Sequence, residues 1–141
     1  MMRYGLLFLI PLLLLAQPDT GLAQDDFYTR PRIDARGDYL TNAGPVSGGT
    51  IYRMAQAGAL WRVVSPGLNC RAQADPKAPS LRWFRRGTLL QANLGMGGAD
   101  EVLYNAKDAR GYTWMWVRSR KGQDLNCYVR ANRHFIRPLM K

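Results

Sequence analysis

From Trp61 onward, Gly and Pro divide the chain into short apolar segments, and this division constrains the fold more than any other feature. Several segments are rich in β-branched and aromatic residues, which is typical of strands. The expected strand segments are Trp61–Ser65, Leu68–Ala72, Leu81–Phe84, Gly87–Asn93, Tyr112–Arg118, Leu125–Arg130 and Phe135-Ile136. The segments are separated by turn sequences such as Pro66-Gly67 and show almost no helical periodicity. The pattern predicts a small all-β barrel or sandwich.

The N-terminus carries a different signal. Arg3 gives a positive start, Leu6–Ala16 is an unbroken apolar run, and Gly21-Leu22-Ala23 places small residues where a signal peptidase would read them. The run is shorter than the roughly 20 residues that a helix needs to span a bilayer. We therefore expect residues 1–23 to be a secretory signal peptide, with an uncleaved membrane anchor as the alternative. The mature chain would begin near Gln24, be periplasmic or extracellular, and keep no stable membrane anchor.

Charge is distributed unevenly along the exported part. Residues 24–60 are about neutral, whereas residues 61–141 contain 15 basic and 5 acidic residues. Such an excess bears on partners and not on the fold. Residues 24–60 also contain many chain breakers, including Gly44-Pro45 and Gly48-Gly49, and we expect a linker or partly ordered segment there. Within it, Ile51–Trp61 is more apolar and favours a short helix or an approach to the first strand.

Cys70 and Cys127 are the only cysteines. In an exported chain, an even cysteine count favours a disulfide. Both cysteines lie in segments that are apolar enough to be strands, and closing a loop of this length would stabilise the fold by about 4 kcal/mol. Two thiols without a CxxC spacing, and with one distant His, form neither a redox motif nor a zinc site.

Four blocks of the sequence resemble, in order, the bacterial SH3-like domain of exported envelope proteins. The blocks similar to the family's LNVRSGPS strand, lkkGt turn, gWykV strand and closing GWVsskYl segment are Leu68–Ala72, Phe84–Leu89, Trp114–Val117 and Cys127–Ile136. The resemblance covers residues 63–139. It implies an SH3-like barrel over residues 61–141, preceded by the signal peptide and the loosely ordered N-terminal segment.

The chain departs from the family pattern at three places. Ala72–Pro76 replaces Ser-Gly-Pro, Gly95–Arg110 is a longer insertion, and Cys127-Tyr128 stands where the family has Gly-Trp. The first and last motifs pack near one another in this family, so the resemblance also implies that the two cysteines can be bridged. Because the loops differ, a family member's ligand cannot be transferred directly to this chain.

We expect neither an enzyme nor a cofactor or metal site. His134 is the only histidine, so a catalytic triad or a His-based metal site has little to build on. Asp100-Glu101 are adjacent carboxylates on an expected loop, and we interpret them as solvated. Arg36-Gly37-Asp38 spells an integrin-binding tripeptide, which we discount because such tripeptides often arise by chance.

Aromatic and basic side chains are mixed in residues 82–86 and 114–120. Strand alternation puts Trp114 and Trp116 on one face and Met115 on the other. We interpret Trp114 as a core residue and leave Trp116 and Trp83 open between core and surface. Rings beside guanidinium groups suit sugars or peptide side chains with anionic groups. The candidate ligand contacts are Trp83, Arg85, Trp116, Arg118, Tyr128 and Arg130.

The leading hypothesis is an exported, non-enzymatic SH3-like module that binds peptidoglycan or a peptide of an envelope protein. One alternative is a nonspecific electrostatic binder of anionic polysaccharide or nucleic acid, whose affinity would fall steeply as salt rises. Another is an accessory subunit of an envelope complex, in which Asp25–Leu60 becomes ordered on a larger partner.

Overall fold

The computed structural model describes residues 31–40, 60–93 and 106–140, which form strands and turns but no helix. The strands are β1 (Leu60–Val63), β2 (Gly67–Arg71), β3 (Ser80–Arg85), β4 (Leu89–Ala92), β5 (Trp114–Ser119), β6 (Asp124–Arg130) and β7 (Ile136–Pro138). Each strand begins within two residues of its predicted segment. The all-β class is therefore confirmed. Within the described ranges, no helix is long and apolar enough to cross a membrane.

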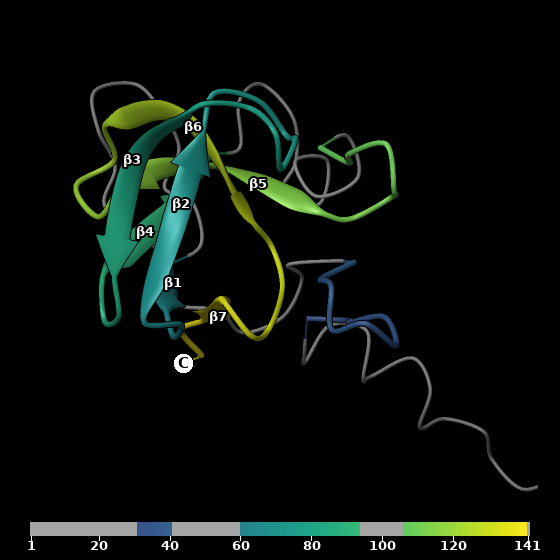
Figure 1. The fold of residues 1–141 in the computed structure, drawn as a ribbon. Helices are drawn as coiled ribbons and strands as arrows, with labels where there is room; N and C mark the ends of the chain where they lie inside the picture. Colours follow the sequence, from purple (N-terminus) through teal and green to yellow (C-terminus); the bar gives the residue numbers. More distant parts are fainter. Residues whose placement is uncertain (1–30, 41–59, 94–105, 141) are drawn as a thin grey trace, which may run out of the picture.

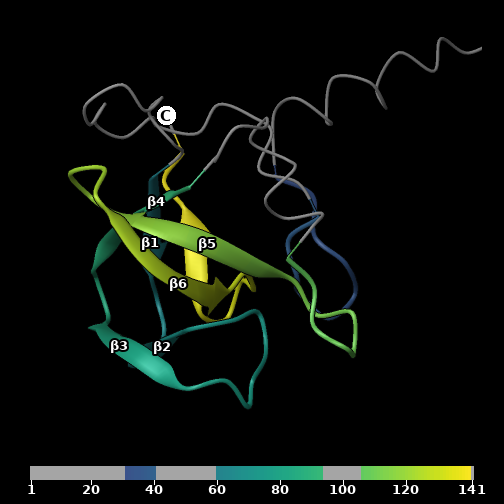
Figure 2. The same cartoon turned by 90° about the horizontal axis from the view of Figure 1, so that it is seen from above.

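The strands form one antiparallel sheet in the order β3-β2-β6-β5-β4-β1-β7. The sheet curls so that β2 and β3 lie opposite β1 and β4 (Figure 1), and the view from above shows the same arrangement (Figure 2). β3 and β7 nevertheless stay at the two edges of the sheet and do not pair, so the described strands do not close into a barrel. β7 has three residues and ends in Pro138, which has no N–H to donate, so it offers little ladder for closure.

The core lies between the two halves of the curled sheet. Its buried side chains are Tyr39, Trp61, Val63, Leu68, Cys70, Leu90, Ala92, Met115, Val117, Cys127, Val129, Ala131 and Ile136. Tyr39 and Trp61 meet edge to face, with ring centroids 4.8 Å apart. Met115 faces this core and Trp114 does not, so the two lie on opposite faces as the strand alternation predicts, but it is Met115 and not Trp114 that joins the central core. The opposite face of β2, β6 and β5 is therefore directed away from this core.

The predicted disulfide between Cys70 and Cys127 is confirmed, with a Cα–Cα distance of 5.4 Å. It joins β2 to β6, which share only one registered pair, Arg71 with Tyr128. The disulfide therefore links two strands that have little ladder in common. Such a bond is compatible with an oxidising, exported location.

Residues 31–40 pack against the sheet, although the sequence favours a linker there. The backbone N–H of Tyr39 donates to the carbonyl of Ala131 (2.9 Å). Beside it, the carboxylate of Asp38 is 0% exposed and pairs with Arg130 at 2.8 Å. The same carboxylate accepts hydrogen bonds from Asn132 Nδ2 (2.7 Å) and from the backbone N–H of Thr113 (3.1 Å). These contacts fasten the segment across both β5 and β6.

The burial of Asp38 also bears on the Arg36-Gly37-Asp38 tripeptide. A carboxylate that is buried and held by three partners cannot be offered to a receptor in this fold. The tripeptide is thus a structural element, in agreement with our discounting it. The predicted signal peptide, and residues 24–30 and 41–59 of the predicted linker, lie outside the described residues.

We expect the double variant Cys70→Ser/Cys127→Ser to lose about 4 kcal/mol of unfolding free energy, because the bridge closes a long loop in the unfolded chain. The bridged cysteines are 57 residues apart. Urea unfolding of the oxidised protein and of the variant measures the difference, and reduced wild type should behave like the variant. Equal stability of the oxidised and reduced forms would show that the bridge contributes no stability.

We expect Arg130→Ala to lower the unfolding free energy by about 3 kcal/mol, because it leaves the buried Asp38 carboxylate without its charge partner. The matched control is Arg36→Ala, which removes an exposed ion pair with Asp34 and should lower the unfolding free energy much less, because exposed ion pairs contribute little to stability. Chemical unfolding of both variants tests this order. A larger loss of unfolding free energy in Arg36→Ala than in Arg130→Ala would contradict the conclusion that the buried Asp38–Arg130 pair contributes more to stability.

Candidate functional site

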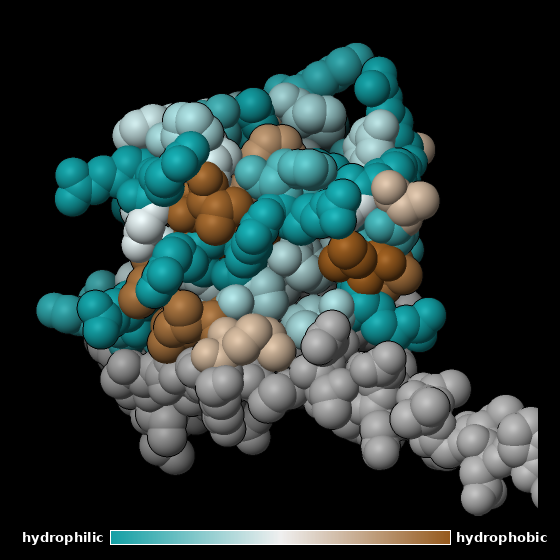
Figure 3. All heavy atoms as spheres, turned by 90° about the horizontal axis from the view of Figure 1, so that it is seen from below, coloured by the Kyte–Doolittle hydropathy of each residue, from teal (hydrophilic) through white to brown (hydrophobic). Residues whose placement is uncertain are grey.

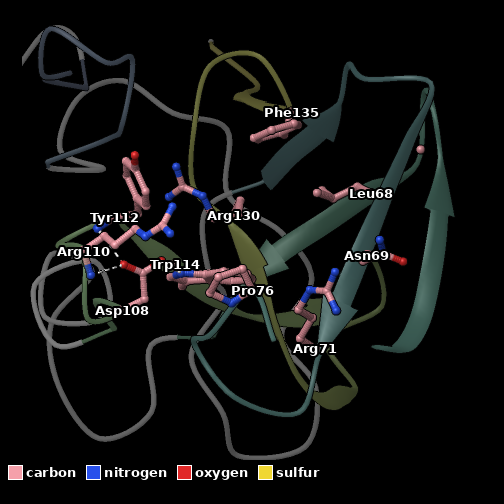
Figure 4. A pocket seen from close by; sticks show the side chains of 11 residues that line it. Leu68, Asn69, Arg71, Pro76, Asp108, Arg110, Tyr112, Trp114, Arg130 and Phe135 are labelled. Atoms are coloured by element: carbon pink, nitrogen blue, oxygen red, sulfur yellow. Dashed lines mark hydrogen bonds between the residues drawn. The ribbon is translucent and has the colours of Figure 1, made fainter. Parts of the chain in front are cut away.

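A groove of about 360 Å³ opens on the sheet where β2 and β6 separate. Its lining comes from β2 and the loop after it, the turn before β5 and the first residue of β5, the end of β6, and the residue that precedes β7 (Figure 4). The lining residues are Gly67, Leu68, Asn69, Arg71, Pro76, Asp108, Arg110, Tyr112, Trp114, Arg130 and Phe135. The groove exists because the two strands pair only at Arg71 and Tyr128.

Three arginines from different parts of the chain line this groove. Arg71 donates to the carbonyl of Ala78 (2.8 Å), and Arg130 is held by its ion pair. Arg110 is exposed, and neither of the two ion pairs between described residues involves it or Arg71. Two guanidinium groups of the groove are therefore placed to meet an anionic ligand.

Among the described residues that line the groove, Asp108 is the single carboxylate, and its oxygens accept hydrogen bonds. Its Oδ2 accepts from Trp114 Nε1 (2.9 Å), and its Oδ1 accepts from the backbone N–H groups of Arg110 (2.9 Å) and Tyr112 (3.1 Å). Burial would raise the pKa of this carboxyl, but these hydrogen bonds and the charge of Arg130 hold the pKa below its ordinary value. Asp108 is thus an ionised anchor that fixes the turn and the Trp114 indole.

Tyr112 forms a rigid part of the groove wall. The guanidinium of Arg36 lies 4.6 Å from its ring centroid, and that of Arg130 lies 4.7 Å from it. Arg130 also lies 5.8 Å from the Trp114 ring centroid. Because cation–π contacts are favourable at such distances, the two rings and Arg130 support one another.

Two of the predicted ligand contacts, Trp116 and Tyr128, lie side by side in the structure. Their rings are stacked with centroids 6.2 Å apart, and both residues are half-buried. Tyr128 is opposite Arg71 in the ladder. The pair therefore forms a short aromatic surface beside one end of the groove.

The other predicted contacts are spread over the sheet. Trp83 is 62% exposed on β3, where its indole covers Gly67, and Arg85 is exposed at the end of the same strand. Arg118 is only 6% exposed, so we do not keep it as a surface contact. Arg130 lines the groove but is half-buried and ion-paired.

Trp114 is buried, as predicted, but not in the central core. It is 1% exposed and lies in the groove, on the face opposite Met115. Five of the lining residues were not among the contacts predicted from the sequence, namely Arg71, Asp108, Arg110, Tyr112 and Phe135. An Asp two residues before an Arg-Gly pair is a turn signal, and this was the one local sign of the Asp108 turn.

Other chemistry is limited in the described residues. These ranges hold no group of three or more His, Cys, Asp or Glu that could bind a metal ion. His134 is exposed, and Asp100-Glu101 lie outside the described residues. On the face that Figure 3 shows, hydrophobic side chains form small groups divided by hydrophilic ones. That face therefore presents no single broad apolar surface.

Comparisons with protein-family models, with curated proteins and with solved structures give no match. The resemblance to the SH3-like domain stays a prediction, and the groove has to be interpreted from its own geometry.

The lowered pKa of Asp108 predicts a pH dependence of stability. Its ordinary value is 3.8; the stabilisation is fully present above that value and is lost as pH falls through the lower folded-state pKa. We expect Asp108→Asn to be less stable than wild type at neutral pH and to lose less stability on acidification. Urea unfolding between neutral and acid pH measures how the unfolding free energy of each protein changes with pH. An identical pH dependence of wild type and Asp108→Asn would contradict the lowered pKa of Asp108.

Proposed function

We propose that this protein is an exported, non-enzymatic SH3-like binding module whose groove binds the carboxylate-bearing peptide stem of peptidoglycan. The observation that carries the proposal is the groove, whose lining combines the Arg71 and Arg110 side chains with the rings of Tyr112, Trp114 and Phe135. This combination offers apolar contact area together with directed charge.

The chemistry of the lining favours a peptide that carries carboxylates. A guanidinium group binds a carboxylate through two parallel hydrogen bonds, which gives both orientation and affinity. The groove volume of about 360 Å³ is near the lower end of ligand pockets. It therefore suits a short side branch better than a polymer chain.

The stacked rings of Trp116 and Tyr128 extend this proposed site. Because Arg71 is the ladder partner of Tyr128 and also lines the groove, a ligand bound in the groove would have its next group beside these rings. Aromatic faces are suitable platforms for sugars. We propose that they contact the glycan next to the bound stem.

The SH3-like assignment and the exported location are supported by two further features. The four resembling blocks fall on β2, the β3–β4 turn, β5 and the part of the chain from β6 to β7 of one antiparallel sheet. The disulfide is compatible with an oxidising compartment. The open edges of the sheet are a departure from a closed barrel.

The competing function is nonspecific binding of anionic polysaccharide or nucleic acid. It is favoured by the excess of basic residues between 61 and 141 and needs no shaped groove. For the accessory-subunit alternative, residues 31–40 already pack on this chain's own sheet, so we do not propose them as a segment that orders on a partner.

Co-sedimentation of the oxidised mature protein with purified peptidoglycan sacculi tests the proposal. We expect retention at both low and high salt, and about tenfold weaker retention for Arg110→Ala, because a charge-assisted hydrogen-bonded contact is lost. Arg110→Lys keeps the charge but loses the planar fork, so it should fall between the two. The matched control is Arg62→Ala, an exposed β1 residue outside the groove, which should bind like wild type.

Each other outcome has a defined meaning. Retention at low salt alone, with equal loss in Arg110→Ala and Arg62→Ala, would replace the shaped groove with nonspecific polyanion binding. No retention at either salt would overturn the peptidoglycan proposal.

A further inference from the structure

The strand β3 is an edge of the sheet and, among the described strands, pairs only with β2. An edge strand presents unpaired backbone N–H and C=O groups to any added strand. Pro79 precedes β3, but no proline lies within Ser80–Arg85. No residue of the strand therefore lacks an N–H, and the alternate N–H groups that point away from β2 are those that a further ladder would use.

The side chains of β3 are unusually exposed for an apolar sequence. Leu81 is 54% exposed and Trp83 is 62% exposed, and residues two apart share one face of a strand. The Trp83 indole covers Gly67 so closely that a Cβ at position 67 would overlap it. A held, exposed aromatic ring of this kind is a suitable anchor for a partner.

The charge on this edge is uniformly positive. Arg82, Arg85 and Arg86 are all exposed, and residues 76–98 contain no Asp or Glu. Neither of the two ion pairs between described residues involves these arginines. The strand thus offers positive charge that no described carboxylate of the chain pairs.

This positive charge determines which kind of strand can pair with the free edge of β3. A second copy that paired along β3 would bring the arginines of both strands together, and like charges facing across strands are destabilising. An acidic strand would instead form opposite-charge pairs. The occupant that fits is therefore an acidic segment and not another copy of this chain.

We propose that the edge of β3 binds an extended segment of a partner protein in which apolar residues alternate with Asp or Glu, and that this segment adds one strand to the sheet. Apolar side chains would be opposite Leu81 and Trp83, and carboxylates opposite Arg82 and Arg85. This surface is distinct from the groove, because it uses backbone pairing at an edge and not a concave pocket.

The test uses the peptide Glu-Thr-Val-Glu-Val-Thr-Glu, which presents the required order of side chains in either direction. We would titrate it into the oxidised, isotope-labelled mature protein and follow backbone amide shifts and hydrogen exchange. The expected result is shift changes and slowed exchange along β3. A peptide with Pro in place of both Thr residues should bind more weakly, because Pro cannot donate to the ladder.

Charge reversal provides the matched variants. Arg82→Glu/Arg85→Glu should bind the acidic peptide about tenfold more weakly, because attraction becomes repulsion at two positions. It should also gain binding to the peptide in which Lys replaces Glu. The control Arg62→Glu/Arg137→Glu makes the same change at an exposed β1–β7 pair and should retain nearly all of the wild-type affinity.

Three results would overturn the proposal: equal binding of the Pro peptide, shift changes centred on Tyr112 and Trp114 instead of β3, or dimerisation of the peptide-free protein that charge reversal at Arg82 and Arg85 abolishes. Arg110→Ala should bind this peptide like wild type. Failure at the edge is therefore distinguishable from failure of the groove.

Discussion

The buried carboxylate of Asp38 holds together the parts of the chain that shape the groove. It pairs with Arg130 at the end of β6 and accepts the N–H of Thr113 just before β5. A buried charge is costly unless its partners are all in place, so docking of residues 31–40 and the geometry of these strand ends are coupled. Arg130, held by this pair, lies over the rings of Tyr112 and Trp114. The aromatic wall of the groove therefore depends on an interaction that lies beneath it.

The groove itself is a consequence of an incomplete ladder. β2 and β6 meet at Arg71 and Tyr128 and are joined next to that pair by the disulfide. Beyond this point the strands separate, and the Asp108 turn contributes to the space between them. A complete β2–β6 ladder would bring the two strands together and leave no such space. Covalent linkage at one position thus allows the sheet to stay open at another.

The two proposed surfaces use basic side chains in different ways. The groove lining combines Arg71 and Arg110 with aromatic rings, so recognition would depend on shape and on the orientation of the guanidinium fork. Along β3, Arg82 and Arg85 flank exposed apolar side chains, so the backbone would supply affinity and charge would select the partner. Both proposed surfaces would favour acidic partners.

Strand alternation and the cysteine pair predicted the β-class, the positions of the strands and the Cys70–Cys127 bridge, because these follow from local periodicity and cysteine count. The buried place of Trp114 was predicted, but the burial of Arg118 was not, because burial on a curled sheet depends on neighbouring strands. The partnership of Asp38 with Arg130 spans 92 residues, and no local pattern contains it. The sequence alone thus accounts for strands, bridge and charge. Only the tertiary structure decides which charges are paired, where the ladder opens and which strand is left as an edge, because these are settled by contacts between distant parts of the chain.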